Sequence, residues 1–153
     1  MADVDSEIVA TYLETEGYFV RLSSRYNPNQ ALADIDILAI HPITGDKIWG
    51  EVKGWVESKE KFQRSWEAYI ENTFDKDAKE KYVRQVLGDK FRKVFYLPLG
   101  RVSEEFKTNL RSKAIEIFDL AEVAKSLKEK SKNGRLSITD KALRLLKILE
   151  MTE

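Results

Sequence analysis

Apolar and polar residues follow two different spacings along the chain, one typical of helices and one typical of strands. Apolar residues from Ile8 to Leu13 recur with helical spacing and Gly17 follows as a stop, which predicts a helix over about residues 4–16. The polar stretch over residues 23–30 contains Asn27-Pro28-Asn29 and predicts a loop. Strands are predicted for five apolar runs, at residues 18–22, 35–40, 48–53, 94–97 and 114–118.

The remaining periodic segments are helical, and they lie in the second half of the chain. Helical spacing starts at residue 62, is interrupted by the charged run Asp75 to Lys81, and resumes at Tyr82. Ser103 is a typical residue to cap a further helix. The predicted helices are 62–74, 82–87, 103–113 and 120–130.

This order of elements predicts an α/β fold with a mixed central sheet flanked by helices. The predicted core domain spans residues 1–130, and residues 131–153 form a linker and a C-terminal amphipathic helix. That last helix can dock on its own core domain, bind a partner or form a homodimer.

Composition excludes several kinds of chemistry. The chain has 153 residues, no Cys and one His, so disulfides, thiolate metal sites, cysteine nucleophiles and multi-histidine metal sites are ruled out. A bound metal would need oxygen ligands, which favours Mg²⁺, Mn²⁺ or Ca²⁺. The acidic N-terminus is no signal peptide and the apolar runs are too short to span a membrane, so we expect a soluble cytoplasmic protein with no membrane partner.

The candidate chemistry lies on the hairpin formed by the second and third predicted strands. Glu51 and Lys53 share a strand face because alternate residues point the same way. If paired residue numbers sum to an odd value, Asp36 joins them on that face, and Ile35 and Ile37 lie on the other, wholly apolar face. An even sum would place charges among core residues, so the odd register is predicted.

Two adjacent carboxylates form a suitable site for a hard cation that keeps open positions for water and phosphate. A nearby lysine can orient a water molecule or neutralise charge on a phosphate. The alternative is an edge hairpin whose solvent face simply carries Asp36, Glu51 and Lys53.

Asp36 in the context Ala33-Asp34-Ile35-Asp36-Ile37, followed by Gly50-Glu51-Val52-Lys53-Gly54, resembles the PD-(D/E)xK, restriction-endonuclease-like superfamily, in particular archaeal Holliday-junction resolvases and small bacterial nuclease-like proteins. The resemblance covers residues 5–54 well and the rest only in element order. It implies a restriction-endonuclease-like fold and a metal-dependent endonuclease that hydrolyses phosphodiester bonds in DNA. It also implies that Asp36 and Glu51 bind Mg²⁺, with Mn²⁺ as a substitute and the Val52 carbonyl as a further ligand, and that Lys53 is catalytic.

The chain departs from these relatives on its first helix. They carry a glutamate eleven residues before the Gly-aromatic pair, where this chain has Ser6. Asp5 shares the apolar helix face and is the better geometric substitute, whereas Glu7 has the expected residue type but points nearly opposite. Asp34 shares the face of Asp36 and is either a helper or a solvated aspartate at the strand entry.

Weaker signals concern nucleic acid. Gln85 lies on a helix where relatives often place a polar residue facing the metal. Phosphate contacts are possible for four basic residues that are solvated by default, namely Arg21, Arg25, Lys59 and Arg64. The alternative function is a catalytically inactive module of the same fold that binds nucleic acid or a protein, which the missing glutamate and the formal net charge of +0 favour.

The net charge of zero conceals an uneven distribution. Residues 1–16 hold five acidic and no basic residues, whereas residues 90–113 and 128–147 each hold seven basic and two acidic residues. Such a chain can still hold DNA on one face, with weaker and more salt-sensitive non-specific binding than a strongly basic resolvase.

Overall fold

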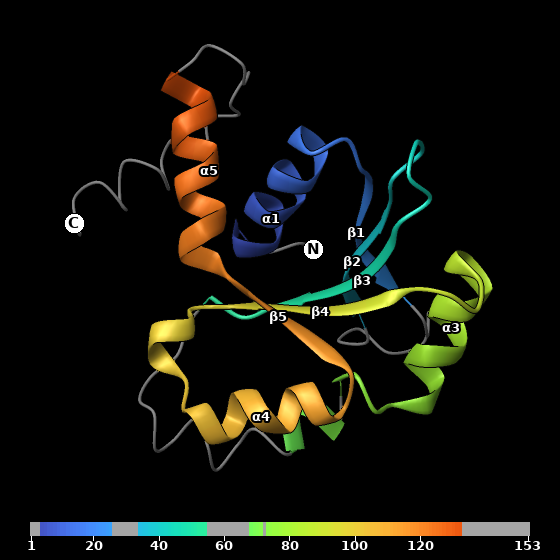
Figure 1. The fold of residues 1–153 in the computed structure, drawn as a ribbon. Coiled ribbons are helices and arrows are strands. Elements are labelled where there is room, and N and C mark those ends of the chain that lie inside the picture. The colour runs from blue at the N-terminus through green and yellow to red at the C-terminus, as the bar shows by residue number, and fades with distance from the viewer. Residues whose placement is uncertain (1–3, 26–33, 55–67, 72, 133–153) are drawn as a thin grey trace.

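The structure is a computed structural model, and it describes residues 4–25, 34–54, 68–71 and 73–132. The described helices and strands follow one another in an α/β order (Figure 1). Helical residues 68–71 and 73 precede α3, and a 3₁₀ turn at Leu99–Arg101 precedes α4. The bounds are α1 Val4–Thr15, β1 Phe19–Arg25, β2 Asp34–Ile40, β3 Lys47–Val52, α3 Asp77–Leu87, β4 Arg92–Leu97, α4 Glu104–Ser112, β5 Ile115–Asp119 and α5 Leu120–Lys132.

The strands form one mixed sheet in the order β1-β2-β3-β4-β5. The first three strands are antiparallel neighbours, and β3, β4 and β5 run parallel. Helices lie on both faces, with α1 and α5 together on one face and α4 on the other (Figure 1). The predicted α/β class, with a mixed sheet flanked by helices, is confirmed.

Each face of the sheet carries its own hydrophobic core. One core joins α1 and α5 to sheet residues such as Ile37 and Val52. The other joins α3, α4 and the helical residue Ile70 to sheet residues such as Trp49 and Phe95. The central strands are therefore buried from both sides, as is typical of a sheet with parallel strands.

Two local signals act as predicted. Gly17 follows α1 with φ of +97°, a conformation that a side chain disfavours, and the Tyr18 N–H bonds the Leu13 carbonyl at 3.0 Å to close the helix end. The Ser103 hydroxyl accepts a hydrogen bond from the Phe106 N–H at 3.2 Å and caps α4. α1 therefore ends, and α4 begins, where the sequence indicates.

Three boundary predictions are wrong. Residues 23–25 belong to strand β1 and not to a loop, because the edge strand continues its pairing with β2 as far as Asp34. The charged run interrupts the helical region only as far as residue 76, because α3 already begins at Asp77 and not at Tyr82. The predicted linker also begins too early, because α5 extends to Lys132.

Ile35 departs from the predicted division of the two faces. It packs in the core of Trp49 and Phe95, whereas Ile37 packs in the other core. Pairing of β1 with β2 passes from Leu22 opposite Ile37 to Ser24 opposite Ile35, and Ser23 between them has φ of +50°. Strand geometry is therefore interrupted beside Ile35.

The division into a core domain over residues 1–130 and a C-terminal segment over 131–153 stays a prediction. The predicted C-terminal helix lies outside the described residues, as do Phe62 and Trp66 of the predicted helix 62–74. Of the helices that the structure describes, none is long and apolar enough to cross a membrane.

Candidate functional site

The two acidic residues of the motif face each other across β2 and β3. The strands pair with Ile37 opposite Gly50 and Leu38 opposite Trp49, so paired numbers have the predicted odd sum. Continued by one residue, this register places Asp36 opposite Glu51. Side chains that lie directly opposite on antiparallel strands point to the same face, which brings the two carboxyl groups together.

The edge-hairpin alternative is wrong. Both strands are interior in the described sheet, since β2 lies between β1 and β3 and β3 lies between β2 and β4. The face that carries Glu51 is also covered, because Leu38 and Trp49 on that face are buried in the core. Glu51 itself is only 2% exposed. A buried carboxylate in the middle of a sheet needs compensating partners.

Backbone and side-chain groups hold both carboxyl groups in place. The Val52 N–H donates to Oδ2 of Asp36 at 2.9 Å, and the Asp36 N–H donates to Oε2 of Glu51 at 3.4 Å. The Trp49 indole N–H donates to Oε1 of Glu51 at 3.0 Å. The strand backbone and one indole thus orient the acidic pair.

A lysine from a helix completes these contacts. Lys79 of α3 is 8% exposed, and its Nζ lies 3.7 Å from Oε1 of Glu51 and 3.1 Å from the backbone carbonyl oxygen of Asp34. Sequence reasoning missed this residue. The available signal was its spacing, since Lys79, Val83 and Leu87 recur every four residues and are the buried positions of α3.

The charge state of Glu51 depends on this environment. Burial raises the pKa of the Glu51 carboxyl well above its usual range, and the negative charge and hydrogen bond of Asp36 raise it further. The Lys79 ammonium and the Trp49 N–H oppose this rise in pKa. An additional cation beside Glu51 would therefore stabilise its ionised form.

Lys53 follows β3 on the same side as Glu51. Its backbone N–H donates to the carbonyl oxygen of Tyr96 at 2.9 Å, which continues the parallel pairing of β3 with β4. Its side chain is partly buried, and its Nζ lies 4.8 Å from the centre of the Tyr69 ring. The structure thus holds this ammonium against an aromatic face.

The first helix brings one of its two acidic candidates to the end of β3. The carboxyl group of Asp5 packs against Gly54, in the space that a side chain at residue 54 would fill. Ser6, at the position of the family glutamate, is 1% exposed, and Glu7 is half-buried. The position of Asp5 agrees with its predicted direction. In the part of the chain that the structure describes, no three acidic or histidine side chains gather into a metal-binding group.

Of the remaining candidates, Asp34 contacts a residue of the site and Gln85 lies on the exposed side of α3. Asp34 begins β2, and its backbone carbonyl contacts Lys79 as described above. Gln85 is exposed and lines a shallow hollow on the outer side of α3, whereas the inward position of that helix is taken by Lys79. The prediction that Gln85 faces the site is wrong, because Gln85 is exposed and lies about 120° around the helix axis from Lys79.

Of the four basic residues predicted to contact nucleic acid, two lie in the part of the chain that the structure describes. Arg21 is exposed on β1, opposite Leu38, and Arg25 ends that strand opposite Asp34. Lys59 and Arg64 lie outside the described residues.

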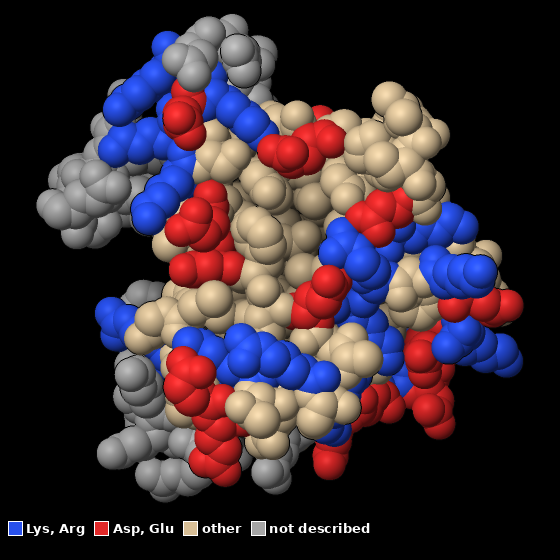
Figure 2. Space-filling model, viewed as in Figure 1, with Lys and Arg blue, Asp and Glu red and all other residues tan. Residues whose placement is uncertain are grey.

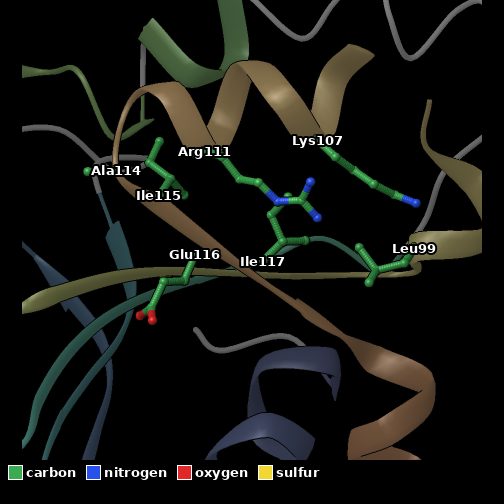
Figure 3. A pocket seen from close by; sticks show the side chains of 7 residues that line it. All are labelled: Leu99, Lys107, Arg111, Ala114, Ile115, Glu116 and Ile117. Atoms are coloured by element: carbon green, nitrogen blue, oxygen red, sulfur yellow. The ribbon is translucent and has the colours of Figure 1, made fainter. Parts of the chain in front are cut away.

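A separate hollow of about 520 Å³ lies along the outermost strand, β5 (Figure 3). The side chains of Lys107 and Arg111 project from α4 over it, and Ile117 lies on its β5 side. Figure 2 shows basic side chains in a band across α4, with acidic side chains close by. Glu51 pairs with Phe95 and Phe95 with Ile117, so the hollow is two strands, or roughly 10 Å, from the acidic pair.

No protein-family model matches the chain. No curated protein matches it by sequence either. Similar solved structures include AF1548, a protein of unknown function, with a TM-score of 0.49 and 14% identity over 94% of this chain and 89% of that chain.

Two further similar structures are a protein described as a repair endonuclease and a protein in complex with DNA. A repair endonuclease from Pyrococcus abyssi has a TM-score of 0.42 and 13% identity over 74% of this chain and 44% of that chain. EndoMS in a complex with double-stranded DNA has a TM-score of 0.43 and 15% identity over 77% of this chain and 44% of that chain. This chain spans less than half the length of these two chains.

Proposed function

We propose that this protein is a metal-dependent endonuclease that hydrolyses phosphodiester bonds in DNA. In this proposal Asp36 and Glu51 are ligands of Mg²⁺, which Mn²⁺ can replace, and Lys53 is the catalytic lysine. The observation that carries it is the contact of Asp36 with the buried Glu51 on two neighbouring interior strands. Burial raises the pKa of Glu51 and the negative charge of Asp36 raises it further, and a divalent cation would relieve the repulsion between the two carboxylates.

The residues present fit a hard cation. Asp36 and Glu51 supply carboxylate oxygens, the ligands that Mg²⁺ prefers. The Val52 N–H points toward Asp36. In an extended strand the carbonyl of the same residue points to the same side, so the Val52 carbonyl is a third oxygen on the Asp36 side of β3. On α1, we assign Asp5 to the site, because its carboxyl group packs against Gly54 just after the end of β3.

In this proposal the two carboxylates and Lys53 have different roles. A divalent cation bound here lowers the pKa of its water and neutralises charge on the phosphate. Asp36 is held by the Val52 N–H, and Glu51 is held by Trp49 and Lys79, so both ligands are oriented in advance. The Lys53 ammonium lies on the face of Glu51 and can stabilise negative charge that develops on the scissile phosphate.

A nicking assay on plasmid, flap and four-way-junction DNA tests this function. We expect cleavage that requires Mg²⁺ and is lost in Glu51→Ala and Lys53→Ala, each measured beside a folded-state control by circular dichroism. Glu122→Gln and Lys125→Met remove an exposed ion pair on α5 and should leave cleavage unchanged. Cleavage that persists unchanged in Glu51→Ala and Lys53→Ala would rule out this assignment.

A second candidate is a catalytically inactive module of this fold that binds nucleic acid or a protein. The observation that favours it is Lys79, because its ammonium already compensates Glu51 without any metal. Calorimetric titration with Mn²⁺ separates the two functions. Mn²⁺ binding that disappears in Asp36→Ala supports the endonuclease, whereas the absence of Mn²⁺ binding in the wild type supports the inactive module.

A further inference from the structure

The position of the Lys53 ammonium is determined by more than its place directly after β3. A lysine side chain has a flexible four-carbon stem, so the backbone fixes its direction but not the location of Nζ. The structure places Nζ 4.8 Å from the centre of the Tyr69 ring. The face of an aromatic ring carries partial negative charge and attracts a cation at this distance.

Tyr69 is itself held in place by the core. It lies in the helical residues 68–71, and its ring is 5.8 Å from that of Phe95, in the core on the Glu51 side of the sheet. Phe95 pairs with Glu51 across β3 and β4. Phe95 thus lies beside Glu51 on the neighbouring strand and also contacts the Tyr69 ring. Tyr69 in turn contacts Lys53, which is two residues after Glu51.

We propose that Tyr69 is a positioning residue for Lys53, with its ring holding the ammonium on the side of the acidic pair. This inference rests on the proposed function in one respect, that Lys53 acts at the same site as Asp36 and Glu51. The helical segment after the hairpin then contributes to the site through an aromatic face. Tyr69 need not touch substrate, because it acts through the location of Lys53.

Three variants separate the ring from the hydroxyl and from general packing. Tyr69→Phe keeps the ring, whereas Tyr69→Leu removes it and keeps an apolar side chain. Tyr82→Leu is the matched control, since Tyr82 is a partly buried tyrosine packed against the same core, on α3. Each variant is compared with the wild type by thermal denaturation, so that a loss of fold is recognised.

The first measurement does not need catalysis. Ring currents of Tyr69 should shift the proton resonances of the Lys53 εCH₂ group in the NMR spectrum. We expect that shift to persist in Tyr69→Phe and in Tyr82→Leu, and to disappear in Tyr69→Leu. An unchanged Lys53 εCH₂ resonance in Tyr69→Leu would overturn the proposal whatever the protein's activity.

The second measurement is cleavage at saturating Mg²⁺ and DNA. We expect Tyr69→Leu to lower kcat by roughly 2- to 30-fold, the range of a cation–π contact, with Mn²⁺ affinity unchanged. Tyr69→Phe should restore most of kcat. A loss in Tyr69→Leu that is matched by Tyr82→Leu, or no loss, would overturn the positioning role.

A double variant separates failure of this inference from failure of the proposed function. In a Lys53→Met background, Tyr69→Leu should add no further loss, because the group that Tyr69 positions is gone. Additive losses would show that Tyr69 acts independently of Lys53. If Lys53→Met alone leaves kcat unchanged, the proposed function of Lys53 fails, and with it the catalytic consequence of the Tyr69 contact.

Discussion

Nζ of Lys79 lies 3.7 Å from Oε1 of Glu51, and the Lys79 and Glu51 side chains are 10% and 2% exposed. This ion pair links a helix, α3, to the central strand β3 through the interior of the protein. Taking two charges out of water is costly, so such a pair is held by accompanying hydrogen bonds. Those bonds are present in the Trp49 indole N–H on Glu51 and in the Asp34 carbonyl on Lys79.

Removing Lys79 should therefore destabilise the fold strongly. Lys79→Met leaves Glu51 buried beside Asp36 without its cation, and breaking a buried pair from one side costs about 3–5 kcal/mol. We expect the free energy of unfolding in urea to fall by about that amount. The control Lys81→Met, at an exposed position of the same helix, should change it by less than about 0.5 kcal/mol. Equal effects of the two variants would contradict a structural role for the ion pair.

The origin of that loss can be checked by removing the second charge. In a chain that carries both Lys79→Met and Glu51→Gln, no unpaired buried charge remains. We expect the double variant to be more stable in urea than Lys79→Met alone, because the Gln amide oxygen still accepts the Trp49 N–H. Losses that simply add would show that Lys79 and Glu51 do not interact.

Glu51 also predicts how stability changes with pH. Its pKa is raised above 4.5 by burial and by Asp36, so the folded protein holds this proton more tightly than the unfolded chain. The resulting contribution to stability is full below pH 4.5 and is lost as pH rises through the raised pKa. We therefore expect the wild type to lose stability relative to Glu51→Gln from pH 4.5 toward neutrality, measured by urea denaturation at each pH. Added Mg²⁺ should reduce that loss if the pair binds it, and a difference that is constant with pH would contradict the raised pKa.

Much of the strand core of the site was predictable because strands have a period of two. Asp36, Glu51 and Lys53 fall on one face of a hairpin whose other face is apolar, and a slip by one residue would bury the charges on the wrong face. That reasoning predicts the odd register that the structure has. It cannot show that a second layer of helices covers the acidic face, because the covering residues are distant in sequence.

The helical contributions were not predicted, for two physical reasons. A lysine in a charged run is ordinarily solvated, so Lys79 is not an obvious buried residue although it lies one turn before Val83. The contact of Tyr69 with Lys53 depends on the path of the chain between them, which local spacing does not determine. The polar residues 23–25 fail as a predicted loop because an edge strand tolerates polar side chains.

Asp5 and Gly54 give a test of the contact between α1 and the end of β3. A methyl group at residue 54 would occupy the position of the Asp5 carboxyl group. We expect Gly54→Ala to lower the free energy of unfolding by about 1–3 kcal/mol, the usual cost of overpacking. Adding Asp5→Ala should restore most of that loss, whereas adding Glu7→Ala should not. Restoration by Glu7→Ala, or by neither, would contradict the contact.

Ala114 is a non-glycine residue with φ of +58°, at the junction between α4 and β5. Its N–H donates to the Arg111 carbonyl at 3.0 Å, so it occupies the left-handed position that closes a helix and that glycine usually fills. The left-handed conformation costs a residue with a Cβ about 1–2 kcal/mol, and the greater freedom of glycine in the unfolded chain offsets part of that. We expect Ala114→Gly to raise the free energy of unfolding by about 0.5–1 kcal/mol in thermal denaturation. Ala124→Gly, inside α5, should lower it by about 0.5–1 kcal/mol, because there glycine only adds unfolded-state freedom. A decrease in both variants would show that Ala114 carries no strain.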